Sequence, residues 1–553
     1  MHRIIPFLLT GCLITTTVHA QQENEIKTLL RILPDVINTD RPAEKCGTPA
    51  ALTLLSRPDS IQPDDRMRIE QVVSRPALSE SYVSNSGIFR IHYDLTGRHA
   101  IDSSATMITG IPDIAVVAAQ AADHAYALLI DSLGFVPHVS DDGADGPEYD
   151  IYLLDLGAQF YGWTIPDDPT GASGGSYYSQ VENDFAGSFA TQGLDAVRVT
   201  VAHEYFHAVQ FAYANKLDDI FFYEMSSVWF EEKAYPEIND YLAYLSDLFN
   251  QPDQSLFSQI YASNIWLKYR LSGTDGSPLR VMWEEFRDNS AATVIRLETE
   301  RAGLPLAGAL AEFYSWCLFT GERAVPGMYF DDARFFPQLR PLQTIDVMTD
   351  TLFQGKVRSM AANYLVLKTD ATRSFAAQYV RGDAENMRLA GVSENLDGSL
   401  GDYFIQRESE QYFLPVQENE GVVNLILANA NEENSDAFKR WLYDLDVRLL
   451  EDNPDRQGIQ AVYPNPLLTS AGSVVSIPFS LPEQGRTSLS ILDETGRVVL
   501  DVSLGERPGG RNRPFAWDGR DENGERVASG IYLVVLRMDN GFQDVAKIAV
   551  IGR

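Results

Sequence analysis

The sequence predicts a multidomain protein in which an α+β domain is followed by two all-β modules. The chain has 553 residues, which is too long for one hydrophobic core. Up to about residue 335, strand patterns alternate with helical ones, including an alanine-rich helix expected over residues 114–133. Beyond residue 340, apolar residues occur in short alternating runs separated by Gly, Asn and Asp, which is typical of β-sandwiches.

The N-terminus predicts export. Residues 1–14 combine a short basic cap with an apolar run, and residues 18–20 (VHA) offer a cleavage site, so residues 1–20 are interpreted as a secretory signal peptide. Residues 9–12 (LTGC) also fit a lipoprotein box, which would make the chain an outer-membrane lipoprotein anchored through Cys12. The apolar run continues past Cys12, which favours soluble secretion. Residues 21–85 are expected to be a peripheral segment or a removable pro-segment.

The most informative motif lies in the α+β region, expected over residues 86–335. His203-Glu204-Tyr205-Phe206-His207 stands in an apolar run over residues 199–213. At about 3.6 residues per turn, the two histidines project from one helix face, so both imidazoles can bind one Zn²⁺ with Glu204 beside the metal. This pattern is the core of a zinc hydrolase site and predicts a zincin-like catalytic domain. The alternative is a core helix whose histidines bind backbone carbonyls.

A catalytic zinc site needs a third protein ligand and an open position for water. The longer pattern with a third histidine is excluded, because Gln210 and Tyr213 stand at its positions and no histidine follows His207. A downstream ligand must then be a carboxylate, and Glu224 is the best candidate. It lies in an aromatic segment, where an ionised carboxylate without a cation costs several kcal/mol.

Two further roles are expected near the ligands. Glu231 shares the helix face of Glu224 two turns later, so it either accepts the free N–H of a ligand histidine or ends the helix in solvent. Glu232 is expected to face solvent. A tyrosine is the expected hydrogen-bond donor to the oxyanion; Tyr261 is the candidate, and Tyr223, Tyr235 and Tyr269 compete with it. The strand expected at residues 174–185 is interpreted as a sheet edge that pairs with substrate, or as an ordinary hairpin strand.

The region resembles a family of secreted bacterial metalloproteases of the gluzincin type, over roughly residues 45–335. The matching stretches are the HEYFH helix, Glu224 with residues 229–231 (WFE), and residues 235–241, 46–49 (CGTP), 89–93, 149–153 and 316–323. The resemblance implies zinc ligation by His203, His207 and Glu224, with Glu204 as the general base. It also implies a protein or peptide substrate, attacked by a water whose pKa zinc lowers to about 7.

Charge and cysteines restrict the partners. A net charge of −33 argues against nucleic acid and anionic membrane surfaces. After the expected signal, no segment reaches the apolar length of an integral membrane helix. Processing after residue 20 would leave two cysteines, Cys46 and Cys317, which could form a disulfide in an oxidising compartment or remain buried thiols.

The C-terminal half is expected to comprise a β-sandwich over residues 340–448, a linker over 449–462 and an Ig-like module over 463–553. Residues 463–466 (YPNP), 477–482, 492–499 and 547–550 resemble the sorting domain of the type IX secretion system, and residues 517–532 are similar to the immunoglobulin-like repeat of flagellar hook-capping proteins. The resemblance implies export through the type IX secretion machinery.

Taken together, these features predict a secreted zinc metalloendopeptidase. The alternative is a non-catalytic surface protein for adhesion or carbohydrate binding, in which the zinc site is structural or a relic. Glu204 favours the peptidase, because a structural zinc site needs ligands but no base.

Overall fold

The structure is a computed structural model. It describes residues 44–56, 67, 74–157, 160–168, 175–187, 189–347, 349–368, 374–381, 386–394, 399–406, 422–432, 440–450, 457–460, 462, 465–468 and 474–551. The expected signal peptide and Cys12 therefore lie outside the described residues, as does half of the expected linker. The chain forms two compact units, Met1–Leu245 with Ile260–Ile295, and Ser246–Gln259 with Arg296–Arg553.

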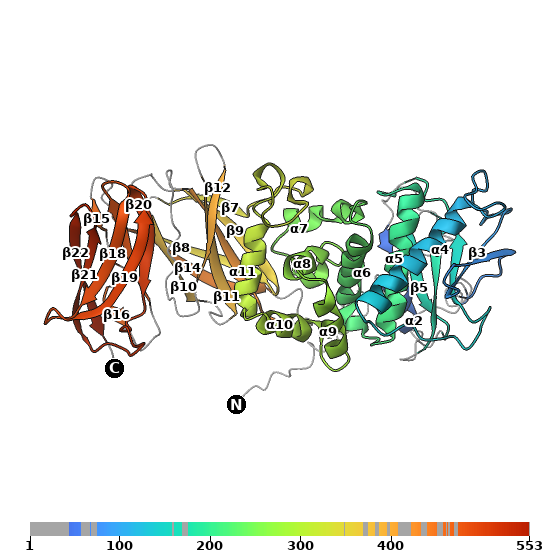
Figure 1. The fold of residues 1–553 in the computed structure, drawn as a ribbon, viewed down its shortest axis with the longest axis horizontal. Coiled ribbons are helices and arrows are strands. Elements are labelled where there is room, and N and C mark those ends of the chain that lie inside the picture. The colour runs from blue at the N-terminus through green and yellow to red at the C-terminus, as the bar shows by residue number, and fades with distance from the viewer. Residues whose placement is uncertain are drawn as a thin grey trace, which may run out of the picture. The chain divides into compact units, whose positions relative to one another are not determined.

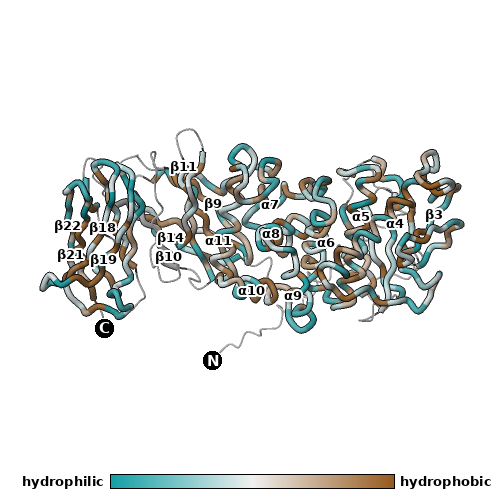
Figure 2. The backbone as a smooth tube through the Cα atoms, in the orientation of Figure 1, coloured by the Kyte–Doolittle hydropathy of each residue, from teal (hydrophilic) through white to brown (hydrophobic). Residues whose placement is uncertain are grey.

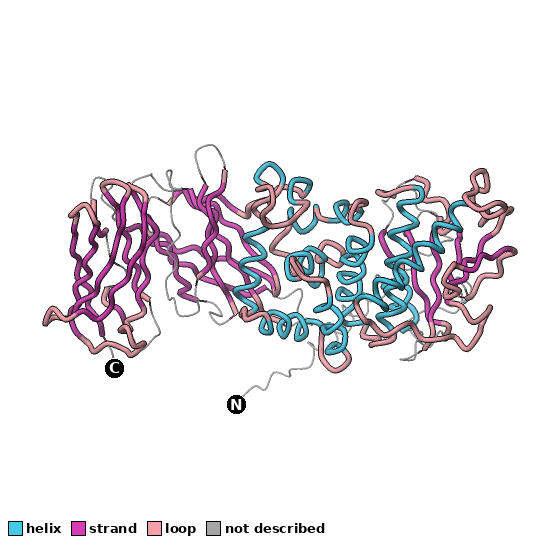
Figure 3. The backbone as a smooth tube through the Cα atoms, viewed as in Figure 1, coloured by secondary structure: helices cyan, strands magenta, loops and turns pink. Residues whose placement is uncertain are grey.

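The first unit is built on a mixed sheet of six strands (Figures 1 and 3). Its strands are β1 (Glu44–Cys46), β2 (Glu80–Val83), β3 (Phe89–Tyr93), β4 (Tyr149–Leu154), β5 (Phe160–Pro166) and β6 (Tyr177–Glu182). The spatial order is β1-β5-β6-β4-β3-β2. Strands β6, β4 and β3 run parallel, β5 runs antiparallel to β6, and β1 pairs in parallel with β5.

Helices cover both faces of this sheet. Those that contact it are α2 (Thr48–Ser56), α4 (Asp113–Tyr126, continued by a π-helix over Ala127–Ser132) and α5 (Gly193–Phe211). Helix α6 (Ile220–Ala234) packs on α5, and α8 (Asn264–Arg270) packs on α6. Helix α9 (Ser277–Phe286) belongs to the same unit. Thr164 of β5 faces α5, where its hydroxyl oxygen lies 2.9 Å from the Glu204 carbonyl oxygen. Its neighbours Trp163 and Ile165 point to the other face and pack with Ala51 of α2. Since side chains alternate along a strand, α5 and α2 lie on opposite faces.

Helix α5 lies unusually close to β5. A Cβ on Gly162 would stand 2.9 Å from Thr200 Cγ2 and 3.0 Å from Glu204 Cγ, so only glycine permits this approach. Nearly every side chain of α5 from Ala196 onward is buried, in agreement with the apolar run seen in the sequence. Figure 2 shows the apolar residues along α4 and α5. The result is a central helix pressed against the sheet.

Of the two interpretations of the strand before α5, the sheet edge is wrong and the hairpin strand agrees with the structure. Strand β6 lies between β4 and β5, and it forms an antiparallel pair with β5, the preceding strand. Strand β5, which is also apolar, pairs with the side of β6 that faces away from β4. The outer partner of β5 is β1, which comes from the N-terminal segment.

One helical stretch, Asp113–Ser132, is apolar and long enough to span a membrane by length and composition alone, among the residues described. It is α4 with its π-helical continuation. This stretch packs on β3 and α5, and 56% of its apolar window is buried. Those are the properties of a core helix in a globular unit.

The second unit contains helices α7 (Ser246–Asn250) and α11 (Leu306–Trp316), most of α10 (Ala291–Arg301), and two β-sandwiches. The strands of the first sandwich are β7 (Gln343–Asp346), β8 (Thr351–Arg358), β9 (Ala361–Lys368), β10 (Ser374–Arg381), β11 (Met387–Glu394), β12 (Leu400–Ile405), β13 (Val422–Asn429) and β14 (Arg440–Leu450). They form sheets β10-β14-β8 and β12-β11-β13-β9-β7. Both sheets contribute to one apolar core, with Leu445 from the first and Leu365 from the second.

The C-terminal module is a second sandwich of two sheets. Its strands are β15 (Gly458–Ile459), β16 (Leu467–Leu468), β17 (Val475–Leu481), β18 (Gly485–Leu492), β19 (Val498–Arg507), β20 (Gly510–Trp517), β21 (Gly530–Met538) and β22 (Gln543–Ile551). They form sheets β15-β17-β20 and β16-β22-β21-β18-β19. Trp517 is 2% exposed and packs in the common core, as expected for an anchor of an Ig-like module.

Candidate metal centre

Helices α5 and α6 bring the three expected ligands together. The antiparallel packing of the two helices sets Glu224 opposite both histidines. The Nε2 atoms of His203 and His207 are 3.1 Å apart. The Glu224 carboxylate lies 3.2 Å from each of them, one oxygen facing each ring. All three side chains are at most 1% exposed.

These spacings fit a shared metal ion. Nitrogen and oxygen ligands about 2.0–2.1 Å from a tetrahedral zinc are about 3.3 Å from one another. Neither oxygen of Glu224 makes a well-aligned hydrogen bond among the described residues, although both are buried and each lies 3.2 Å from a histidine Nε2. A buried carboxylate without a hydrogen bond is costly unless a cation compensates it. Donor types, spacing and unsatisfied oxygens are therefore all consistent with zinc.

Each ligand histidine is held by a partner on its other ring nitrogen. His203 Nδ1 lies 2.6 Å from Glu231 Oε1, and His207 Nδ1 lies 2.7 Å from Gln210 Oε1. The Gln210 amide donates in turn to Ser227 Oγ at 3.1 Å. Such contacts direct Nε2 toward the metal position and fix the tautomer. Glu231 thus takes the first of its two expected roles, and it is 1% exposed rather than in solvent.

Burial of negative charge extends beyond the ligands. Lys45 Nζ lies 2.8 Å from Glu231 Oε2 and also binds Asp240, and both pairs are buried. The centre thus contains the carboxyl groups of Glu204, Glu224, Glu231 and Asp240 but one buried ammonium. Without a metal, Glu224 and Glu231 raise the pKa of His203 to about 10, even though burial lowers it. A divalent cation would balance this excess of negative charge.

Glu204 lies beside the ligands, with one oxygen engaged. Its Oε2 accepts hydrogen bonds from Thr164 Oγ1 at 2.8 Å and from Thr48 Oγ1 at 3.3 Å. Its Oε1 is buried and has no partner in the described part of the chain. Burial raises the pKa of Glu204, and the two ligand histidines oppose this shift. Such a carboxyl group is suited to take up and return a proton.

A fourth donor comes from the N-terminal segment. Cys46 Sγ lies 3.4 Å from His207 Nε2, and the donor atoms of Cys46, His203, His207 and Glu224 all lie within 4.8 Å of one another. The expected Cys46–Cys317 disulfide is wrong, because both cysteines are free thiols. Each is enclosed in a different compact unit, and Cys46 is directed at the histidines.

Tyr261 comes nearest to the centre among the four tyrosines considered. Its hydroxyl lies 3.2 Å from both the backbone N and the backbone O of Cys46. By contrast, the Tyr223 hydroxyl donates to the Ala214 carbonyl, and the Tyr235 ring lies against His124. Tyr269 packs beside Trp266. Tyr261 is thus placed to donate a hydrogen bond to a peptide carbonyl beside the ligands.

Sequence reasoning assigned no role to Lys45, Thr48, Thr164 or Asp240, and it interpreted Cys46 as a disulfide partner or a buried thiol, not as a possible ligand. One available signal was the run Cys46-Gly47-Thr48-Pro49, which had been matched to a metalloprotease family without any role being assigned to it. The expectation that Glu232 faces solvent is also wrong. It is 9% exposed and pairs with Lys268 at 3.2 Å.

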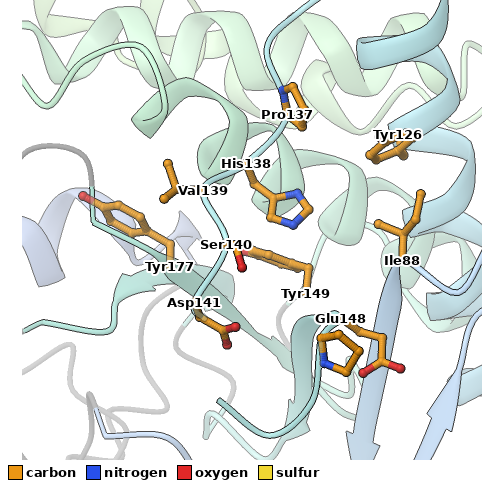
Figure 4. A pocket seen from close by; sticks show the side chains of 11 residues that line it. Ile88, Tyr126, Pro137, His138, Val139, Ser140, Asp141, Glu148, Tyr149 and Tyr177 are labelled. Atoms are coloured by element: carbon orange, nitrogen blue, oxygen red, sulfur yellow. The ribbon is translucent and has the colours of Figure 1, made fainter. Parts of the chain in front are cut away.

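A separate small pocket of about 150 Å³ opens elsewhere on the first unit. Figure 4 shows His138, Tyr126, Tyr149 and Tyr177 around it. His138 Nδ1 lies 3.1 Å from the Tyr205 hydroxyl, and burial lowers the pKa of this histidine to about 4. The lining contains none of the candidate metal ligands, so this pocket is separate from the centre.

Comparison with known proteins supports the C-terminal module. Residues 466–541 match the family model of the FlgD Ig-like domain, which confirms the expected hook-capping-like module. No curated protein matches the chain.

Solved structures show weak likeness. One match is PorZ, described as an essential bacterial surface component of the type-IX secretion system of Porphyromonas gingivalis: 25% identity over 20% of this chain and 14% of that chain, with a TM-score of 0.15. Another is dimeric latent PorU from Porphyromonas gingivalis: 15% identity over 39% of this chain and 19% of that chain, with a TM-score of 0.15. The matched parts thus span less than a fifth of the length of PorZ and of PorU. TM-scores this low carry no argument about fold.

The contact between Glu231 and His203 predicts a role in metal affinity. Glu231→Gln keeps the size of the side chain but weakens the acceptor of the His203 N–H, so we expect zinc affinity to fall by about 10- to 100-fold. Competition with a chromophoric chelator measures this. Glu232→Gln, which removes a neighbouring buried carboxylate paired with Lys268, is the matched control and should leave zinc affinity unchanged. Equal affinities for both variants would contradict the role of Glu231.

The lowered pKa of His138 predicts a pH-dependent stability. Because the folded unit prefers neutral His138, this residue contributes stability above its ordinary pKa of 6.5, and the contribution is lost as pH falls toward about 4. His138→Asn cannot titrate, so its stability should fall less over that interval, by about 3 kcal/mol. Urea unfolding of the first unit at a series of pH values checks this. Parallel pH profiles for the two proteins would rule it out.

Proposed function

We propose that the chain is a secreted zinc metallopeptidase that hydrolyses peptide bonds with Glu204 as general base. One observation carries this proposal: a buried carboxylate with a free oxygen stands beside a cluster of metal-binding donors. A structural zinc site needs ligands but no such base, and burying an additional carboxylate would only destabilise it. His203, His207 and Glu224 are the residues that would hold the ion.

Each side chain has a definable task. A zinc ion bound there would supply a polarised water at neutral pH. Glu204 would accept a proton from that water and return it to the leaving amine, while Thr164 holds its other oxygen in place. The Tyr261 hydroxyl would donate to the oxygen of the attacked carbonyl. Main-chain groups of β5, which pair with β1 in this structure, would align an extended peptide only after β1 has moved away.

The proposed location of the protein rests on its signal-like N-terminal pattern and on its C-terminal Ig-like domain. The N-terminal pattern suits a secretory signal, and the FlgD Ig-like domain is an all-β module that can act as a separate address. We propose that the protein is secreted or displayed at the cell surface and that its C-terminal module is read by the type IX secretion machinery.

A second function is favoured by one observation. Cys46 adds a fourth protein donor to His203, His207 and Glu224, and four protein donors are typical of structural zinc sites. The protein would then be a non-catalytic adhesion or carbohydrate-binding protein. Its Glu204 would have no chemical task.

Glu204→Gln separates the two functions. We expect the variant to bind zinc like the wild type and to lose peptide hydrolysis by at least about 100-fold, because proton transfer is removed while the ligands remain. Mass spectrometry of a broad peptide library measures cleavage, with zinc content determined on the same samples.

The assay is run on intact protein and on protein whose N-terminal segment has been cleaved. Glu232→Gln, which changes a neighbouring buried carboxylate that pairs with Lys268, is the matched control and should retain wild-type cleavage. If zinc-loaded wild type cleaves no peptide in either form, the peptidase proposal fails and the binding protein takes its place.

A further inference from the structure

The segment that contains β1 and α2 touches every functional part of the centre. Lys45 binds Glu231 and Asp240, Cys46 lies against His207, and Thr48 donates to Glu204. The Tyr261 hydroxyl accepts a hydrogen bond from the backbone N–H of Cys46 and donates one to the Cys46 carbonyl. A stretch of four residues thus engages the ligands, the base and the candidate oxyanion donor together.

Strand β1 occupies the edge of β5 that a substrate would need. Glu44 and Cys46 pair with Phe160 and Gly162, and Gly47 N donates to Gly162 O at 2.9 Å. Without β1, β5 would be the outermost strand on this side of the sheet. Adding a strand to an open edge is a general way of binding an extended peptide. The chain's own segment therefore holds the position of such a peptide.

Packing around the segment leaves no room for a second peptide. The ring of Phe160 lies 3.0 Å from where a Cβ on Gly47 would stand, so the backbone passes close over the strand. Glu204, His207 and Glu224 are each 0% exposed. A substrate carbonyl can reach them only if residues 44–56 move away.

We propose that residues 44–56 keep the enzyme latent, with the Cys46 thiolate as fourth zinc ligand, and that separating this segment from β5 opens the site. This inference rests on the proposed function. On release, the bond between sulfur and metal breaks, the thiolate leaves with its segment, and water can take the open position. No redox change is involved.

The chain offers a place for separation. Arg75 is anchored to the sheet by ion pairs with Asp150, Asp141 and Asp167, the last two at 2.7 and 2.6 Å. Cleavage between α2 and Arg75 would therefore free residues 44–56 while leaving the chain after Arg75 attached.

The test uses the full chain with a specific protease site inserted within residues 57–66 and with Co²⁺ in place of zinc. A thiolate bound to Co²⁺ gives a charge-transfer absorption that nitrogen and oxygen ligands do not. We expect this band in the uncut protein and in Cys317→Ser, and its absence in Cys46→Ser, which should still bind one Co²⁺ per chain. Cutting should abolish the band with Co²⁺ retained, increase the rate of Cys46 alkylation by about tenfold or more, and expose peptidase activity.

Other outcomes distinguish a failure of the latency inference from a failure of the proposed peptidase function. A band that persists after cutting, or metal lost together with the segment, would show that Cys46 is a permanent structural ligand and would overturn latency. An uncut protein without the band but with bound metal would overturn ligation by Cys46. If the band disappears, Co²⁺ stays and Cys46 becomes reactive but no peptide is cleaved, the segment is removable as inferred and the proposed peptidase function is what fails.

Discussion

The centre of the first unit depends on the electrostatic balance of buried carboxylates. Glu204, Glu224, Glu231 and Asp240 are all at most 4% exposed, and Lys45 is the buried ammonium among them. A low-dielectric interior does not tolerate such an excess of negative charge without a cation. The inward-facing Nε2 atoms of the two histidines mark where the proposed cation would bind.

The rest of the unit can be understood as the support for this balance. Gly162 lets α5 approach β5, which brings Thr164 to Glu204. The antiparallel packing of α5 and α6 sets Glu224 between the two histidines and Glu231 behind one of them. The N-terminal strand then closes the arrangement from the outside. A site built in this way is preorganised and shielded from water, which suits a hydrolase held in reserve.

Much of this arrangement could be predicted because it is local. The HEYFH motif and helical periodicity place His203, Glu204 and His207 on one helix, and the aromatic surroundings of Glu224 indicate a carboxylate that needs a cation. What could not be predicted depends on strand order. Nothing in the periodicity of residues 44–48 shows that they pair with a strand more than a hundred residues later. The sequence therefore left Cys46 as a disulfide partner or a buried thiol, and the strand before α5 as a sheet edge or a hairpin strand. Long-range pairing is decided by the whole sheet, not by a local pattern.

The most direct test of the account is the zinc content of the mature protein beside that of Glu224→Ala, measured by elemental analysis after extensive dialysis. The account predicts close to one zinc per chain in the wild type and loss of that zinc in the variant, because removing Glu224 leaves too few ligands and too little negative charge opposite the histidines. Absence of zinc from both proteins would contradict the metal centre, and with it the peptidase and the latency that depend on it.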